Sequence, residues 1–194
     1  MAKIRLEPDI SYFYPWPLVL VSCVDEAGKP NIITIGASSV CSAHPPTVGV
    51  AIGVRQYSLG LVNATQDFGV NIPTADQLWE SDYCGSVSGR SMSKFESAGF
   101  TPQESAIIRS PLIEECPVSM ECKLIHTAHL GDHDWLIGEI VAVHAGEAVL
   151  TSSRRLDRAR TNPVFSFWGE YWSVGEKLAD WHYALRARKA GPDG

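Results

Sequence analysis

The chain has 194 residues, of which 45% are hydrophobic and 20% are charged, and its net charge is −6. This length and composition are typical of one globular domain with a sizeable core, and the negative charge argues against a nucleic-acid partner, for which a basic surface is expected. Because the sequence shows no secretory signal, no apolar run of membrane-spanning length and no CxxC pair among its five cysteines, we expect a cytoplasmic protein with reduced thiols and no membrane partner.

Short β-like runs dominate the first half of the chain. Residues 18–24 are apolar and end at the turn-forming sequence DEAGKP, after which residues 31–40 form a second run. Two such runs around a turn predict a β-hairpin. Further strands are predicted at residues 47–54 and 68–72.

Two longer β-like runs follow in the second half, at residues 119–130 and 135–150, with GDHD between them. They predict a second hairpin. Strands at this spacing favour a closed or partly closed antiparallel barrel over alternating βαβ units. We therefore expect a mainly β fold with a few short helices.

Three short helices are expected. The first covers residues 57–68, with Ser58 as its N-cap. The second begins at Thr74 and the third at Ser93, and each has Gln or Glu three residues later, which is the spacing of a capping box. The third helix is expected to end before Gly99.

The run SVSGRSMSK places two cations, Arg90 and Lys94, among small residues in an acidic chain. Small residues let backbone N–H groups point inward, and a helix beginning at Ser93 adds its positive end. Arginine supplies a forked donor and lysine a point charge. Together they predict an anion site, most naturally for a phosphate monoester. The alternative is a solvated turn with two surface cations.

Two further segments are candidates for a ligand site. RQYS offers Arg55, the Ser58 hydroxyl and the N–H groups of a helix start; its alternative is a capped helix with a surface arginine. GASSVCSAHPP, residues 36–46, is a run of mostly small residues at a strand end, which would let a flat ligand approach the backbone closely. Its alternative is a crossover between strands.

Taken in order, these segments resemble the flavin reductase-like family of FMN-binding split barrels, and they are most similar to its flavoredoxin branch. The resemblance covers residues 14–176. It implies an antiparallel Greek-key-type barrel that forms a homodimer, with residues 1–13 as an N-terminal extension and residues 177–194 as a tail. It rests on the ordered set YPWPLVLVSCVDEAGKPNI, VCSAHPP, FGVNIP, SGRSMSKF, GDHDWLIGEI and GEYWSVGE.

The resemblance also implies FMN as the cofactor and gives each candidate residue a place around it. His133 matches a histidine near the flavin face, where it would position the electron donor or assist protonation; the alternative is a turn histidine without a role. The positions beside the isoalloxazine ring match Ser38, Ser39, Val40 and Cys41. Those around the ribityl phosphate match Arg55, Ser58, Ser88, Gly89, Arg90 and Lys94.

The implied function is an oxidoreductase in which NADH or NADPH reduces FMN, which then passes electrons to an acceptor such as a partner oxygenase or another redox protein. Two alternatives stay open. The first is a flavoredoxin-like carrier that holds FMN tightly and does not react with NAD(P)H. The second is a non-catalytic barrel that binds haem or another planar ligand. No metal site is expected, because the histidines at 126, 129 and 133 lie on a β-like segment and do not share one face.

Overall fold

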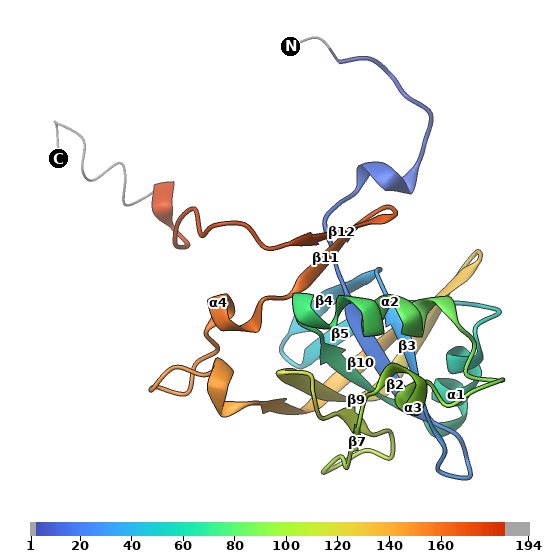
Figure 1. Ribbon diagram of the computed structural model, residues 1–194. Helices are drawn as coiled ribbons and strands as arrows, with labels where there is room; N and C mark the ends of the chain where they lie inside the picture. Colours follow the sequence, from blue (N-terminus) through green and yellow to red (C-terminus); the bar gives the residue numbers. More distant parts are fainter. Residues whose placement is uncertain (1–2, 185–194) are drawn as a thin grey trace, which may run out of the picture.

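The computed structural model describes residues 3–184. Its main feature is an antiparallel seven-stranded sheet in the order β3-β2-β6-β9-β10-β5-β4, curved into a barrel (Figure 1). The edge strands β3 and β4 are not paired with each other within the described residues, so the barrel is split. Its strands are β2 (Val19–Val24), β3 (Pro30–Ile35), β4 (Ser38–Ala43), β5 (Pro46–Gly53), β6 (Asp67–Ile72), β9 (Val118–Leu130) and β10 (His133–Ala145).

Both predicted hairpins are confirmed. Strands β2 and β3 pair with Val19 opposite Ile35, and β9 and β10 pair from Leu130 and His133 onward. The single strand predicted over residues 31–40 is wrong. The chain leaves β3 after Ile35 and begins a separate edge strand, β4, which pairs with β5. Residues 36–46 therefore contain the first strand and the turn of a third hairpin, and β5 is its second strand.

The apolar residues divide into two clusters on opposite faces of β2. Val21 faces the barrel interior with residues such as Val50 and Phe68. Leu20 faces outward, where α2 (Leu78–Ser86) and α3 (Lys94–Ala98) cover it. Because β2 is buried on both faces, its sequence is apolar except for Ser22 and does not alternate.

Two of the predicted helix starts are confirmed. Thr74 and Gln77 form the capping box at the 3-10 turn η2 (Ala75–Gln77) before α2. Ser93 accepts a hydrogen bond from the backbone N–H of residue 96 at the start of α3, and Gly99 ends that helix in the left-handed region.

The predicted N-cap at Ser58 is wrong. Helix α1 (Tyr57–Thr65) is preceded by Gln56, which has the extended backbone of an N-cap. Ser58 therefore lies inside the first turn. Its buried hydroxyl accepts a hydrogen bond from Asn31 instead of capping the helix.

A small second sheet projects from the barrel. It consists of β1 (Trp16–Pro17), β11 (Val164–Phe167) and β12 (Glu170–Ser173). The Tyr171 hydroxyl donates to Asp82 Oδ1 at 2.5 Å and so ties this sheet to α2. The remaining elements are η1 (Ile10–Tyr12), β7 (Pro102–Gln103), β8 (Leu112–Ile113), η3 (Glu147–Val149) and α4 (Arg158–Thr161).

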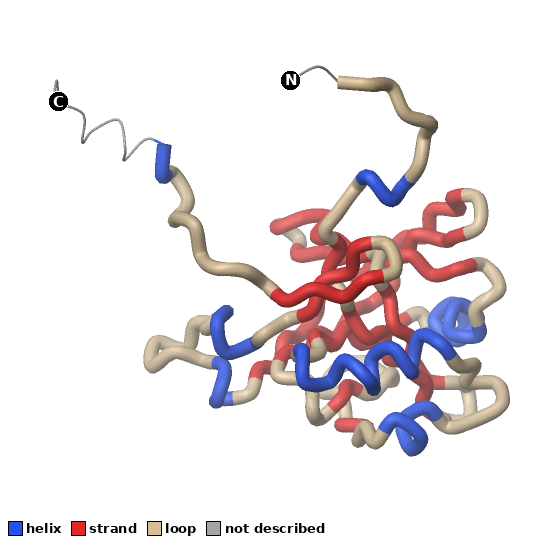
Figure 2. Tube along the Cα trace, turned by 45° about the horizontal axis from the view of Figure 1, so that its top comes forward, coloured by secondary structure: helices blue, strands red, loops and turns tan. Residues whose placement is uncertain are grey.

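The segments at the two ends of the described chain extend away from the barrel. Residues 3–13 and 174–184 leave the body near the small sheet in both views (Figure 1, Figure 2). Of the predicted tail, residues 185–194 lie outside the described part of the chain. None of the described helices combines the length and the apolar character that crossing a membrane requires.

Candidate functional site

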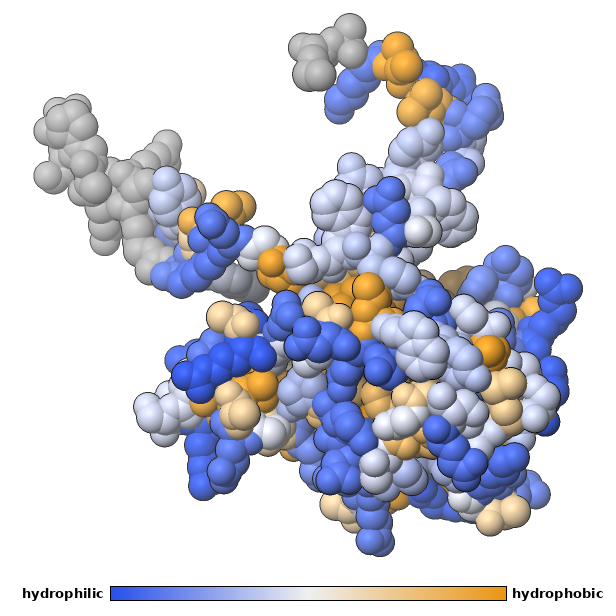
Figure 3. Space-filling view, in the orientation of Figure 1, coloured by the Kyte–Doolittle hydropathy of each residue, from blue (hydrophilic) through white to orange (hydrophobic). Residues whose placement is uncertain are grey.

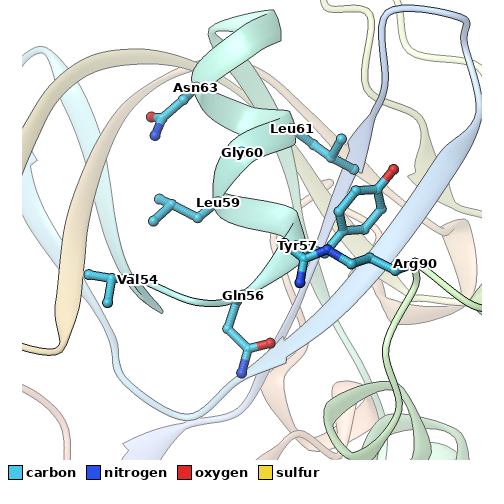
Figure 4. A pocket seen from close by; sticks show the side chains of 8 residues that line it. All are labelled: Val54, Gln56, Tyr57, Leu59, Gly60, Leu61, Asn63 and Arg90. Carbon is cyan, nitrogen blue, oxygen red and sulfur yellow. The ribbon is translucent and has the colours of Figure 1, made fainter.

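A surface hollow of about 410 Å³ lies where two of the predicted ligand segments meet (Figure 4). One wall is the first part of α1 and the connection that leads into it from β5. The other is the loop between α2 and α3, which contributes Arg90. The structure thus brings the RQYS segment and the SGRSMSK segment together. The lining residues are Val54, Gln56, Tyr57, Leu59, Gly60, Leu61, Asn63 and Arg90.

Arg90 is held at the rim of this hollow by an aromatic ring. Its guanidinium carbon lies 5.4 Å from the centroid of the Tyr57 ring, which is a cation–π distance (Figure 4). Arg55 is exposed and lies between two lining residues, Val54 and Gln56. Both arginines are therefore exposed cations on the two segments that form the hollow, where they can attract an anion.

The loop that carries Arg90 approaches the barrel closely at Gly89. A Cβ atom at this position would overlap the amide oxygen of Asn31 in β3. Ser88, one residue earlier, is exposed, and its hydroxyl accepts a long hydrogen bond from the Arg90 N–H at 3.4 Å. The predicted phosphate residues Ser88, Gly89 and Arg90 are thus consecutive in one turn beside the hollow.

Two other predicted phosphate residues face inward. The Lys94 side chain is buried and its Nζ donates to the Cys84 carbonyl, at the end of α2, at 2.6 Å. Burial lowers the pKa of Lys94. Ser58 is also buried. Lys94 turns inward because it shares the buried face of α3 with Phe95 and Ala98, so the structure shows it as part of the protein interior and not as a surface point charge.

The predicted ring segment forms the exposed edge strand β4. Ser38 Oγ donates to the Pro17 carbonyl at 3.1 Å, whereas Ser39, Val40 and Cys41 are exposed. An edge strand presents unpaired N–H and C=O groups, which suit the polar rim of a planar ring. Ser38 pairs with Val50, which lies four residues, or about 13 Å of extended chain, before Val54 in the lining of the hollow.

His133 lies at the same corner of the barrel. It begins β10 opposite Gly53, and its Nε2 faces that glycine. Its Nδ1 lies 2.8 Å from Asp132 Oδ1. The hydrogen bond and positive charge of His133, together with the charge of Arg55, lower the pKa of Asp132. His133 and the RQYS segment are therefore neighbours.

Two histidines of this hairpin, His129 and His133, each contact one carboxylate. His129 Nδ1 lies 2.9 Å from Asp134 Oδ1, while His133 is paired with Asp132. Among residues 3–184, no three His, Cys, Asp or Glu side chains gather in an arrangement that could hold a metal ion.

Sequence reasoning missed two residues that shape the site. Tyr57 lies in the quoted RQYS segment, yet its ring under Arg90 could not be inferred without the fold. Asn31 had a visible signal, because it is a polar residue at the start of an apolar β run, and such a residue is buried only with hydrogen-bond partners.

Residues 11–160 match the family described as flavin reductase like domain. The structure is similar to flavoredoxin of Desulfovibrio vulgaris (Miyazaki F), with 31% identity, a TM-score of 0.88 and coverage of 95% of this chain and 100% of that one. Flavoredoxin from Methanosarcina acetivorans is similar with 26% identity, a TM-score of 0.88 and coverage of 97% and 100%.

A sequence relative carries a name that describes an activity. An NADH:riboflavin 5′-phosphate oxidoreductase of Streptomyces pristinaespiralis is 24% identical over 131 residues, which cover 68% of this chain and 72% of that protein.

Proposed function

Since the chain belongs to the flavin reductase-like family, we propose that it is an FMN-binding oxidoreductase that takes electrons from NADH or NADPH and passes them to an acceptor. The observation that carries the proposal is the hollow with Arg90 at its rim, Arg55 on the segment that lines it and an exposed edge strand about 13 Å away along the chain. This arrangement provides separate places for a charged and a planar part of one ligand.

The phosphate of FMN would lie beside the loop at residues 88–90. A phosphate monoester carries about −1.5 to −2 charges at neutral pH, so it requires cations and N–H donors. Arg90 and Arg55 supply the cations, and Ser88 supplies a hydroxyl. Gly89 has no side chain to fill the space beside Asn31, so the loop can lie close to the barrel. The residues present therefore fit the phosphate.

The ring of FMN would lie along β4, at Ser38–Cys41. When bound, FMN supplies the capacity to accept a hydride and to release electrons. The backbone groups of this edge strand would orient the ring and hydrogen-bond its polar rim. The contact between His133 Nδ1 and Asp132 fixes the imidazole. If Nδ1 carries the proton of that hydrogen bond, Nε2 is left as the atom that can accept one.

A second candidate function is electron carriage without direct reaction with NAD(P)H. It is favoured by the likeness to two flavoredoxin structures, each with a TM-score of 0.88. Both functions use the same pocket. For the NAD(P)H-dependent oxidoreductase, the electron acceptor would be a partner oxygenase or another redox protein. For the carrier, it would be another redox protein.

The decisive experiment is a visible absorption spectrum of the freshly purified protein, followed by NADH or NADPH without air. We expect a bound-flavin spectrum that bleaches rapidly. A flavin spectrum that persists until another protein donates electrons would identify a carrier. Absence of flavin after addition of FMN would refute the proposed function, and a haem spectrum would assign the barrel to another planar ligand.

Two further parts of the proposal concern assembly and location. All five cysteines are free thiols in the structure, which supports a reducing, cytoplasmic location.

Exposed apolar side chains on the segments outside the barrel support a homodimer. In the space-filling view, apolar atoms gather where these segments leave the barrel (Figure 3).

A further inference from the structure

One buried side chain, Asn31, contacts both segments of the proposed phosphate site. It belongs to β3, and 4% of its surface is exposed. On one side its Nδ2 donates to Ser58 Oγ at 2.8 Å, in the first turn of α1. That turn directly follows Arg55. The amide therefore fixes the start of α1 against the barrel.

On its other side, Asn31 limits the approach of the phosphate loop. Its Oδ1 is buried and accepts no hydrogen bond from the described residues. This oxygen lies against Gly89, where a Cβ atom would overlap it. The loop thus rests on the Asn31 amide, and only a residue without a Cβ permits that contact.

The two ends of the loop are tied together, while Asn31 and the Tyr57 ring both contact its centre. Lys94 Nζ donates to the Cys84 carbonyl, so the start of α3 is tied to the end of α2. Residues 87–93 between these helices then have little freedom to move as a unit. The separation between the Arg55 and Arg90 segments consequently depends on two side chains that stand between them, Asn31 and Tyr57.

We propose that Asn31 is a positioning residue for the cofactor phosphate. Together with the Tyr57 ring, it sets the distance between the start of α1 and the Gly89–Arg90 turn, and thereby the spacing of the two segments whose arginines are proposed to receive the phosphate. The inference rests on the proposed function, because it concerns how the same site recognises FMN. It predicts that Asn31 affects recognition of the phosphate and leaves recognition of the ring unchanged.

The first test compares FMN with riboflavin, which has the same ring system and lacks the phosphate. Asn31→Ala removes both the donor to Ser58 and the support of Gly89. We expect its dissociation constant for FMN to rise about tenfold or more, as is usual when a supporting contact is removed, while that for riboflavin stays within about threefold. An unchanged FMN affinity, or equal losses for both ligands, would overturn the inference.

The second test is a double-mutant cycle between Asn31 and Gly89. Gly89→Ala should weaken FMN binding, because its methyl group would meet Oδ1 of Asn31. In the Asn31→Ala background that oxygen is gone, so the same change should cost much less. Strictly additive losses would overturn the inference. Gly146→Ala is the control, since its Cβ would meet only the Pro117 carbonyl at 3.9 Å, an ordinary contact.

The outcomes remain distinguishable from a failure of folding or of the proposed function. Circular dichroism and thermal unfolding establish that each variant is folded. If Gly89→Ala does not fold, the ratio of FMN to riboflavin affinity in Asn31→Ala still decides the inference. If the wild-type protein binds neither flavin, the proposed function is refuted.

Discussion

Arg90 is the residue on which the phosphate site most depends. Its guanidinium is held over the Tyr57 ring at the rim of the hollow (Figure 4). An arginine can donate two parallel hydrogen bonds to a phosphate, and this geometry holds its side chain near the place where they would form. A contact of this kind contributes more than an ordinary surface ion pair.

We expect Arg90→Ala to weaken FMN binding by about 1.5–3 kcal/mol, or roughly 10- to 100-fold, because a charge-assisted hydrogen bond is lost. Fluorescence titration with FMN measures this loss, and added salt should reduce the difference. Arg158→Ala, on the far helix α4, serves as the control. An Arg90→Ala variant with wild-type affinity would contradict the phosphate assignment.

At the residue scale, the sequence predicted which residues gather and did not predict which way they face. The residue patterns gave RQYS and SGRSMSK as two separate candidate segments, the family resemblance placed both around one phosphate, and the structure makes them neighbours. Lys94 and Ser58 turn inward because each lies on the buried face of a short helix. Residue type alone does not reveal this, since a lysine at a helix start is usually solvated.

Among the elements, the segment at residues 106–110 is held by two carboxylates. Glu121 in β9 accepts hydrogen bonds from three consecutive backbone N–H groups, those of residues 106–108, at 2.7–3.0 Å. Asp67 at the start of β6 accepts those of residues 109 and 110 at 3.1 and 3.0 Å. His144 Nε2 lies 2.7 Å from Glu121 Oε1. The two carboxylates fasten this segment to the barrel.

The protonation of Glu121 should therefore affect stability. Burial alone would raise its pKa, but the hydrogen bonds from the 106–108 segment and His144 outweigh burial and lower it. Because the pKa is lower in the folded state than in the unfolded chain, the stabilisation is complete above the ordinary value of about 4.3 and is lost as the pH falls through the folded-state pKa.

We expect Glu121→Gln to lower the free energy of unfolding at pH 7 by about 1–3 kcal/mol, since an amide offers one acceptor oxygen in place of two. Urea unfolding measured between pH 7 and pH 3 checks this, and the variant should lose part of the acid dependence of the wild type. Glu114→Gln is the matched control because Glu114 is exposed. If the free energy of unfolding of Glu121→Gln fell with acid as much as that of the wild type, the role of Glu121 would be contradicted.

The sequence predicted strands well where turn chemistry marked their ends. The first hairpin follows the DEAGKP turn and the second the GDHD turn, and both have the predicted pairing. β4 was missed as a separate strand because residues 38–40 were predicted to continue the strand that contains residues 31–35, and the break after Ile35 was not recognised. It forms because backbone pairing with β5 completes the sheet, which a local pattern does not show.

For the whole molecule, the segments outside the barrel point to a partner. Phe13, Leu178 and Trp168 are 79%, 96% and 59% exposed. Leaving several large apolar side chains this exposed to water costs free energy. A second copy of the chain is the simplest cover, because closed two-fold pairs are the commonest soluble assemblies.

We expect a mass of twice the 21.2 kDa of one chain in sedimentation equilibrium at micromolar concentration. The double replacement Phe13→Ser and Trp168→Ser should shift the protein toward monomer, because it removes apolar surface from the proposed interface. Val143→Ser is the control, since Val143 is also 63% exposed but lies on strand β10 of the barrel. A wild-type monomer would refute the proposed dimer.

The two faces of β2 are both covered, whereas β4 lies at the open edge of the split barrel. Amide hydrogens in β2 can therefore exchange with solvent only when most of the barrel opens, while those of β4 exchange through local fraying that leaves the rest intact. The strand proposed to meet the flavin ring is thus an edge strand that can separate from the sheet at a smaller free-energy cost than β2. A planar ligand could bind to β4 without disturbing the central strands of the barrel.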